Sequence, residues 1–468
     1  MEPGITSLLP PLLAIALAVT TRQIYLSLAA GVWLGYTLLL AGDPLLGLRE
    51  AIEGLVAVLS NPGDARIAMF TLVIGALIAL MERSNGVKGF VDWLEHKRLV
   101  AGARSAQWLA WLIGVGIFIE SNMTLLVSGA VARPLFDRFR VAREKLAYLI
   151  DSTSAPICIL IPLNAWGAFN LSLLSDLGQG NALEIFIASI PYNFYAIAAV
   201  LLAAATIGFG LNVGPMAAAE KRTREGLPLW PESTPMVDQD LLGATAEGPP
   251  AKARNMVVPV FAMVLMMAAG LYITGDGDLV AGSGSTSILW AALFALAIAW
   301  ILLLAQKAFT MDELTKVSLK GAGGLLPVAI ILIFALALGD LTDKLGTGIY
   351  VASAIGDSLP PALLLPVVFL LAGIMAFSVG SSWGTFAVMI PIAVPMAGAL
   401  GLPPAPFLAA VLSGGIFGDH ASPISDTTVV ASMAAATDHI DHVRTQLPYA
   451  LASAAIALLA FFVTGLLL

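Results

Sequence analysis

Long apolar stretches, separated by short polar segments, run along the whole chain. They lie at Leu8–Thr20, Ile24–Ala41, Ile67–Met81, Ile185–Leu211, Met256–Ile273, Ile288–Ala305, Leu325–Leu338, Ala362–Phe377 and Leu447–Leu468. About 20 apolar residues are enough for a helix to cross the roughly 30 Å of hydrocarbon in a bilayer. The pattern therefore predicts an all-α polytopic membrane protein with roughly eleven to thirteen membrane segments, some of them interrupted.

One segment departs from this pattern. Gly418–Thr428 is crowded with ionisable and hydroxyl groups, although it lies within some of the most apolar sequence of the chain. A carboxylate near the centre of a bilayer costs several kcal/mol, so its presence there indicates a function. The proline and glycine of this segment also break a helix, and transporters place ion sites at helices broken inside the membrane.

Composition supports the membrane assignment. Hydrophobic residues make up 59% of the 468 positions and charged residues 12%, about half the charged share of a soluble domain. The first apolar stretch follows Glu2 and lacks the basic start of a signal peptide, so we expect it to be retained. We expect an integral protein of a prokaryotic inner (plasma) membrane, with the lipid bilayer as a partner.

The chain lacks the sequence signs of several other classes. Cys158 is the only cysteine, which excludes a disulfide framework and a cysteine-built metal site. A net charge of −8 does not favour nucleic acid as a partner. The sequence contains no His-Glu-x-x-His and no Walker-type loop. We therefore expect a transporter driven by ion gradients, not an enzyme, with no cofactor apart from the Na⁺ and H⁺ that it carries.

Two parts of the chain carry the same order of polar motifs. Ser121–Thr124 precedes Asp151–Ile157 in the first half, and Ser382–Thr385 precedes Asp419–Ile424 in the second. In each half a proline lies ten residues after the threonine. A repeated order with similar spacing predicts two copies of one unit, as in many transporters.

Loop charges indicate how the two copies are oriented. The loop after Pro134 carries Arg138, Arg140, Arg143 and Lys145. The matching second-half loop, which runs from Pro395 to Pro404, carries no lysine or arginine. Because Lys and Arg prefer cytoplasmic loops, the copies are predicted to lie in opposite orientations. This inverted-topology repeat is typical of secondary transporters.

The same charges predict a re-entrant hairpin. Basic residues flank Ser105–Leu135 on both sides, so this segment would enter and leave the membrane on the same side. Its two legs of roughly fifteen residues are too short for two full spans at 1.5 Å per residue. We therefore expect a hairpin with its tip near Glu120–Thr124. A single tilted span, with one basic cluster outside, is the alternative.

These features divide the chain into five segments. They are N-terminal membrane helices at residues 1–64, the first repeat at 65–213, a polar cytoplasmic linker at 214–255, connecting membrane helices at 256–324 and the second repeat at 325–468. The linker is rich in Glu, Lys, Pro and Thr, and we expect it to be mobile and without chemistry of its own.

The second-half motif offers carboxylates and hydroxyls, which are hard ligands that suit Na⁺. We predict ion or proton binding by Asp419, His420, Ser422, Ser425, Asp426 and Thr427. Two residues have a second interpretation. Ser425 or Asp426 could be the N-cap of the helix that restarts after Pro423, and His420 is either a proton carrier or a hydrogen-bond partner of a neighbouring Asp.

The first-half motif offers a similar set. Its candidates are Asp151, Ser152, Ser154 and Asn164. Two helix breaks that meet at a pseudo-twofold axis would bring together Asp151, Asp419 and Asp426 near the membrane midplane, where we place a Na⁺ ion. Such a carboxylate cluster would bind either H⁺ or the cation, and this competition would link the two gradients.

Residues near the two expected hairpin tips are further candidates. Glu120 is predicted to take part in ion binding, with exposure at a water-filled vestibule as the alternative. The candidates for a substrate pocket are Asn122, Thr124, Trp166, Ser381, Ser382 and Trp383. For the small polar residues of the second tip, helix packing is an equally good interpretation.

The motifs also resemble those of a known family. Gly418–Thr428, which reads Gly-Asp-His-Ala-Ser-Pro-Ile-Ser-Asp-Thr-Thr, closely resembles the signature of the NhaC-type Na⁺/H⁺ antiporter family. Asp151–Pro156 with Trp166-Gly looks like the matching first-half motif, and the similarity covers about residues 65–465. Ala421 stands where other members often have Cys.

This resemblance implies Na⁺/H⁺ exchange by inverted repeats with re-entrant hairpins, in a superfamily whose members are often homodimers with an elevator motion. Relatives are thought to exchange organic solutes, so a Na⁺- or H⁺-coupled carrier of a small organic solute is the alternative. Intramembrane Arg and Lys, which would pair with an organic carboxylate, are few, and this favours a cation as cargo.

Overall fold

The computed structural model describes residues 4–21, 23–86, 88–90, 102–118, 121–162, 164–178, 180–235, 249–277, 282–347, 349–350, 359–423 and 425–468. Within these ranges every regular element is a helix. The N-terminal elements are η1 (Ile5–Leu8), α1 (Leu9–Thr21), α2 (Ile24–Leu39), α3 (Pro44–Ser60) and α4 (Pro62–Arg83). The expected all-α class is confirmed.

Helices of the first repeat, of the linker and of the connecting segment follow, the last of them reaching into the second repeat. The first group is α6 (Ala103–Gly116), α7 (Ser121–Arg138), α8 (Arg143–Asp151), α9 (Ala155–Cys158), α10 (Ala165–Asp176), α11 (Ala182–Ser189), η2 (Ile190–Tyr192) and α12 (Phe194–Gly208). The second is α13 (Pro215–Arg224), α15 (Arg254–Thr274), α16 (Gly284–Ala305) and α17 (Met311–Lys344). The chain ends with α19 (Pro361–Val379), α20 (Ser382–Ala399), α21 (Pro404–Ala421), α22 (Asp426–Ala435) and α23 (His439–Leu467).

By length and composition, 6 of the described helices can cross a membrane, or up to 9 if each bent pair counts as one span. One such pair is α2 with α3, bent by 120°. Several of these helices expose large apolar side chains, such as Leu459 on α23, which is 65% exposed. An exposed apolar face suits lipid rather than water. The roughly eleven to thirteen segments expected from the sequence include interrupted helices, which are too short to be counted by this length criterion.

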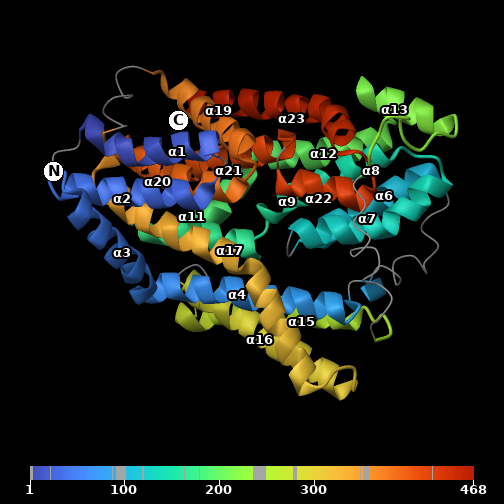
Figure 1. The fold of residues 1–468 in the computed structure, drawn as a ribbon, viewed down its shortest axis with the longest axis horizontal. Coiled ribbons are helices and arrows are strands. Elements are labelled where there is room, and N and C mark those ends of the chain that lie inside the picture. Colours follow the sequence, from blue (N-terminus) through green and yellow to red (C-terminus); the bar gives the residue numbers. More distant parts are fainter. Residues whose placement is uncertain are drawn as a thin grey trace.

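The helices form a long molecule with the polar breaks near its middle (Figure 1). In this view α4, α15 and α16 lie along one long side, and α19 and α23 lie along the other. Helix α21 packs closely against α19. At the contact a Cβ on Gly418 would overlap the backbone of Gly373 and Phe377, so glycine is required for this approach. The close packing fixes the depth at which the next residue, Asp419, lies.

The chain reverses between α6 and α7. Helix α6 ends at Gly116 and α7 begins at Ser121, and the two helices pack side by side. The Thr124 hydroxyl donates a hydrogen bond to the carbonyl of Ile117 across the turn. A helical hairpin is therefore present, and a single continuous span is not formed; that both of its ends lie on the same side of the membrane stays a prediction. Its tip residue Glu120 lies outside the described residues.

A second reversal joins α19 to α20. Gly380, with a φ of 71°, and Ser381 form the connection. The two halves thus share the order hairpin, helix, break and helix. After the break, each half packs on the other half: α22 contacts α7 and α8, and α10 contacts α20. Consequently the two breaks lie within one polar core.

The first part of the linker is held in place, contrary to the expected mobility. The guanidinium of Arg222 on α13 binds both carboxylate oxygens of Glu144 on α8, at 2.8 and 3.0 Å, and both side chains are buried. Farther on, Ser233 donates to Asp441 and Thr234 donates to Asp438. The linker therefore connects the start of α8 with the start of α23. Residues 236–248 lie outside the described residues.

Candidate functional site

Each half interrupts a helix next to a buried carboxylate. Helix α8 ends at Asp151, and the chain turns before Pro156 enters the first turn of α9. Helix α21 ends two residues after Asp419, and α22 begins after Pro423. Proline lacks the N–H that a continuing helix needs, so both breaks are encoded locally. The freed backbone groups and nearby hydroxyls surround the carboxylates.

Asp419 is bound by hydroxyl groups. Ser425 donates to Oδ1 at 2.6 Å, and Ser382 donates to Oδ2 at 2.6 Å. A longer contact of 3.5 Å joins the Thr427 hydroxyl to Oδ2. Ser382 comes from the tip of the second hairpin and the other two from the start of α22, so all of them belong to the same repeat as Asp419. The surroundings of this carboxylate are hard oxygen atoms.

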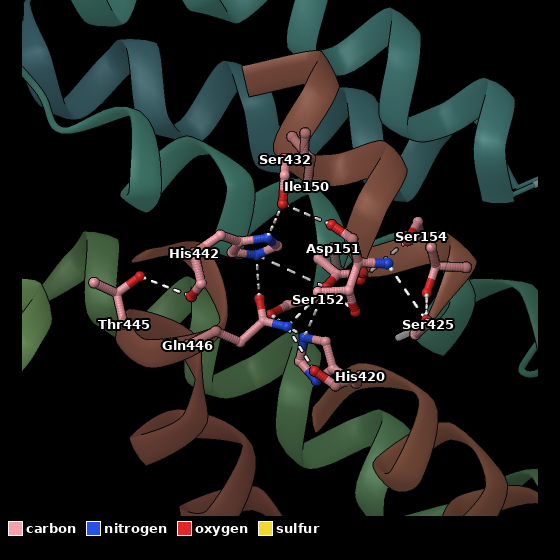
Figure 2. A network of polar contacts seen from close by, with 12 residues as sticks. Ile150, Asp151, Ser152, Ser154, His420, Ser425, Ser432, His442, Thr445 and Gln446 are labelled. Carbon is pink, nitrogen blue, oxygen red and sulfur yellow. Dashed lines mark hydrogen bonds and ion pairs between the residues drawn. The ribbon is translucent and has the colours of Figure 1, made fainter. Parts of the chain in front are cut away.

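Asp151 is bound instead by residues of the other repeat. The Gln446 amide donates to Oδ2 at 2.7 Å, and the Thr428 hydroxyl is 3.4 Å from the same oxygen. Two imidazoles lie near it, with Nε2 of His420 at 4.0 Å and Nε2 of His442 at 3.9 Å. Figure 2 shows these side chains converging on Asp151 from α21 and α23. Nitrogen groups therefore dominate the surroundings of this carboxylate.

His420 connects the two sides of the network. Its Nδ1 lies 2.7 Å from the Tyr195 hydroxyl, and its Nε2 lies 3.2 Å from the Ser152 hydroxyl. Its carbonyl oxygen accepts a hydrogen bond from the Gln446 amide at 2.7 Å. Both ring nitrogens of His420 therefore have hydroxyl partners. This fits the prediction that His420 is a hydrogen-bond partner, but its partners are Tyr195 and Ser152 and not an Asp carboxylate.

Thr428 links the two carboxylate groups directly. Its hydroxyl is 3.4 Å from Oδ2 of Asp151 and 3.4 Å from the carbonyl oxygen of Asp419. The members of the network are almost completely buried: Asp151, Ser152, Asp419, His420, Ser425, Thr427, Thr428, His442 and Gln446. Burying so many polar groups is costly unless they bind one another or a ligand. A network of this size therefore indicates a functional site.

Three predicted ion ligands hold the backbone of the breaks. Ser154 donates to the carbonyl of Asp151 at 3.0 Å, and Ser422 donates to that of Phe377 at 2.7 Å. The Asn164 amide donates to the carbonyls of Phe118 and Cys158, at 3.0 and 2.8 Å, and its oxygen caps α10 by accepting from Gly167. These contacts fix the ends of helices. Direct ion binding by the three side chains stays a prediction.

The N-cap of α22 is Ser425, whose hydroxyl accepts from the N–H of Thr428. Asp426 is the first residue of that helix, so Ser425, and not Asp426, is the residue that caps it. The side chains of Asp426 and Asn122 lie outside the described residues.

The predicted pocket residues lie where the repeats meet. The rings of Trp166 on α10 and Trp383 on α20 are 4.5 Å apart, and Phe169 stands edge-on to Trp383 at 5.0 Å. Ser381 caps α20, while its neighbour Ser382 binds Asp419. Because Trp383 and Ser382 are neighbours on α20, the aromatic contact lies next to the group around Asp419.

Sequence reasoning did not select several members of the network. These are Tyr195, Thr428, Ser432, His442 and Gln446. His439, His442 and Gln446 have helical spacing at the polar start of α23, which would have indicated that they share one face of that helix. Tyr195 has no such signal, because a single tyrosine in an apolar helix is ordinary.

Comparison with known families decides the class of protein. The model of the Na⁺/H⁺ antiporter family matches residues 172–466. The chain belongs to the Na⁺/H⁺ antiporter family. The matched region contains the Asp419 motif and nearly all of α23, whereas Asp151 precedes it.

Similar proteins agree with this family assignment. An uncharacterized protein of Haemophilus influenzae is 31% identical over 487 residues, which cover 99% of this chain and 91% of that protein. The arginine/ornithine antiporter ArcD of Halobacterium salinarum is 30% identical over 216 residues, which cover 45% of this chain and 41% of that protein. The YdaH transporter of Alcanivorax borkumensis shares the fold, with a TM-score of 0.56 and 16% identity over 90% of this chain and 88% of that one.

The protein is therefore an integral membrane protein and a secondary transporter. A bacterial plasma membrane fits the relatives. Its polar network lies at two helix breaks, a feature that secondary transporters often use to bind ions.

Proposed function

We propose that this member of the family exchanges Na⁺ for H⁺ and that Asp419 and Asp151 bind different ions. Asp419 would bind Na⁺, and Asp151 would bind the proton. The observation that carries the proposal is the difference in their partners: hydroxyl oxygens around Asp419, and an amide and two imidazoles around Asp151. The Na⁺ site suggested by the sequence is thus narrowed to the second-half motif.

The Asp419 group has the chemistry of a Na⁺ site. Carboxylate and hydroxyl oxygens are hard ligands, and each hydroxyl can turn its proton away and offer a lone pair to a cation. Ser382 and Ser425 stand on opposite oxygens of the same carboxylate, at 2.6 Å each. A monovalent cation placed among them would neutralise a buried charge. This gain compensates for the dehydration of the ion.

The Asp151 group suits a proton better. Nitrogen donors and imidazoles are poor ligands for Na⁺, whereas a carboxylate next to imidazole can exchange protons with it. The carboxylate is also 1% exposed, so it needs a proton or a charged neighbour in this position.

Coupling would follow from the contact between the two groups. Thr428 joins Asp151 to the backbone of Asp419, and both carboxylates lie beside the break between α21 and α22. A cation at Asp419 therefore disfavours a second positive charge at Asp151 through low-dielectric repulsion. Only one of the two loaded forms is then stable at a time, which is the condition for exchange. The elevator motion and the homodimer implied by the family remain proposals.

Reconstituted protein tests this function. In proteoliposomes with an internal pH dye, addition of Na⁺ or Li⁺ should release protons, whereas K⁺ should not. The Asp419→Asn variant should lose this response, because asparagine keeps the size of the side chain and removes its charge. If active wild-type protein moved no protons with Na⁺ or Li⁺, the proposal would be wrong.

A second candidate, an organic cargo, is favoured by one observation. On α10, Nε1 of Trp166 and the side-chain amide of Asn170 are buried and have no hydrogen-bond partner within the described part of the chain. The two residues are one helical turn apart, and the ring of Trp166 lies 4.5 Å from that of Trp383, tilted by 40°. Unpaired buried polar groups beside an aromatic wall are suited to a small polar solute.

Solute flux separates the two candidates. Arginine, the solute named for the ArcD relative, and a small carboxylate can be offered against a Na⁺ gradient. Uptake that depends on Asn170 but releases no protons would favour the organic cargo.

A further inference from the structure

A chain of side chains leads from Asp151 toward the exposed start of α23. His442 lies 3.9 Å from the carboxylate through Nε2, and its Nδ1 is 2.9 Å from the hydroxyl of Ser432 on α22. The same hydroxyl is 3.0 Å from Nδ1 of His439. His439 is half-buried, whereas the other members are buried. The chain thus spans the distance from the core to the surface of the protein; Figure 2 shows its inner part.

The proton on His442 can be assigned from its partners. The nitrogen of the Gln446 amide faces two acceptors, Oδ2 of Asp151 and the carbonyl of His420, both at 2.7 Å. The amide oxygen must then be the atom that faces Nε2 of His442, at 2.8 Å. A carbonyl oxygen only accepts, so Nε2 of His442 carries a hydrogen. In a neutral ring, Nδ1 of His442 is therefore an acceptor.

The same argument applies to His439. Its Nε2 is 2.6 Å from the carbonyl oxygen of Pro423, which can only accept, so this nitrogen also carries a hydrogen. In a neutral ring, Nδ1 of His439 is again an acceptor. Both Nδ1 atoms face the single hydroxyl of Ser432, which in addition lies 2.8 Å from the carbonyl of Thr428.

The hydroxyl of Ser432 thus has one hydrogen and three acceptors around it. With both rings neutral, at least two acceptors point at its oxygen without a hydrogen between them. A buried polar atom without a partner costs about 1–3 kcal/mol. One additional proton on either Nδ1 resolves the conflict at both ring nitrogens, because that ring then donates to Ser432 and the hydroxyl donates to the other ring; the Thr428 carbonyl then receives no hydrogen from this hydroxyl.

We propose that His439, Ser432 and His442 form a proton-binding relay that holds this additional proton and delivers it to Asp151. In the first step His439 gives its Nδ1 proton to the Ser432 oxygen, while Ser432 gives its own to Nδ1 of His442. His442 is then doubly protonated and passes the Nε2 proton to the Asp151 carboxylate after turning from Gln446. The delivery to Asp151 rests on the proposed exchange of Na⁺ for H⁺; the additional proton does not.

The charges around the relay come from three helices. On α23, Asp438 and Asp441 lie in the turn that holds His439. On α8, Asp151 faces His442, and Arg143 donates to the carbonyl of Ala436 next to the relay at 3.0 Å.

Arg143 itself is paired with Asp137 of α7 at 2.9 Å. Although partial burial acts to raise the pKa of Asp438, N–H donors from Asp441, Thr234 and Ile440 lower it. Asp438 is therefore a stable negative charge beside His439, and it favours the protonated form of that ring.

Nitrogen NMR tests the additional proton without any transport assay. The chain has 4 histidines, so ¹⁵N-histidine-labelled protein in liposomes gives a small set of imidazole signals. At pH 8 a free histidine, with a pKa of about 6.5, is almost fully neutral. The relay predicts one imidazolium at this pH in the wild type. It should disappear in Ser432→Ala and be kept in Ser413→Ala, which changes a buried serine of α21 outside the network.

Two results would overturn the relay: four neutral imidazoles in the wild type at pH 8, or an imidazolium that persists unchanged in Ser432→Ala. Thermal unfolding of both serine variants shows that each is folded, and Ser432→Thr, which restores a hydroxyl, should restore the signal.

Transport then tests delivery to Asp151. In His439→Gln the ratio of Na⁺-driven proton release to ²²Na⁺/Na⁺ exchange should fall at least about tenfold, corresponding to about 1.4 kcal/mol. An unchanged ratio contradicts delivery. If wild-type protein releases no protons with Na⁺, the proposed function fails, whereas the NMR result on the relay still stands.

Discussion

The carboxylates Asp151 and Asp419 follow from one repeated motif but lie in different chemical surroundings. Both are buried next to a proline-induced break. Asp419 accepts from hydroxyls of its own repeat, whereas Asp151 accepts from Gln446 and Thr428 of the other repeat. A repeated backbone can therefore hold two sites of unlike chemistry, because each site is completed by whatever packs against it.

The hairpin tips explain part of this difference. In the second half, the tip places the Ser382 hydroxyl on Asp419. In the first half Ser121 is the residue that corresponds to Ser382, and the nearby Thr124 hydroxyl donates inside its own hairpin, to the carbonyl of Ile117. The space beside Asp151 is instead occupied by the start of α23, which brings His442 and Gln446. An additional helix thus gives the first-half carboxylate different partners from those of its second-half counterpart.

The largest expected effect separates the two carboxylates. Asp419→Asn should lower both Na⁺/H⁺ exchange and ²²Na⁺/Na⁺ exchange at least about 100-fold, since a buried cation loses its counter-charge. Asp151→Asn should lower Na⁺/H⁺ exchange as strongly but lower ²²Na⁺/Na⁺ exchange less. Both exchanges are measured in the same proteoliposomes. Equal losses in the two variants would show that the sites share one role.

A smaller effect is expected at Gln446, the residue that completes the Asp151 group. Gln446→Ala removes one hydrogen-bond partner from each of the Asp151 carboxylate, the His420 carbonyl and His442. At about 1–3 kcal/mol for one such group, proton-coupled exchange should fall roughly tenfold or more. The control is Gln107→Ala, whose side chain is exposed on α6. A normal pH profile of transport in Gln446→Ala would show that the amide only fills space.

A still smaller effect is expected at Ser382, on the Asp419 side. Ser382→Ala removes one of the hydroxyls on this carboxylate, so the Na⁺ concentration for half-maximal exchange should rise several-fold, by about 1 kcal/mol. The pH profile should remain unchanged, because the Asp151 group is intact. Ser378→Ala is the matched control, since that serine is half-buried on α19 and donates to the Ile374 carbonyl of its own helix. A shifted pH profile with unchanged Na⁺ dependence would reverse the roles assigned to the two groups.

The smallest effect on transport by folded protein is expected at the linker. Arg222→Ala leaves the buried Glu144 carboxylate without its partner, which destabilises a protein by about 3–5 kcal/mol. The melting temperature should fall clearly, whereas the Na⁺ dependence of the remaining folded protein should change least of all the variants. The double variant Arg222→Met with Glu144→Leu should recover part of the melting temperature, because it leaves no unpaired charge. If it melts no higher than Arg222→Ala, the ion pair is not what holds α13 on α8.

The sequence was sufficient to predict the helices and their breaks, but it did not predict the hydrogen-bond partners of the buried carboxylates. Apolar stretches and prolines predict the helices and their breaks, since these depend on residues within one turn. The hairpin at Ser105–Leu135 followed from loop charge alone. The bond from Gln446 to Asp151 could not follow in this way, because the two residues are 295 positions apart. The ordered start of the linker was missed because its polar composition is typical of mobile segments, and the buried pair of Arg222 with Glu144 outweighs composition.

By itself the sequence determined that this chain is a helical membrane protein with two broken-helix motifs, each carrying a buried carboxylate. Apolar length, proline and charge act locally, so they can be read in one dimension. Only the tertiary structure decided that hydroxyls surround Asp419 while Gln446, His442 and His420 surround Asp151. The reason is physical: a buried polar group takes its properties from the donors and acceptors within about 3–4 Å, and these come from distant parts of the chain.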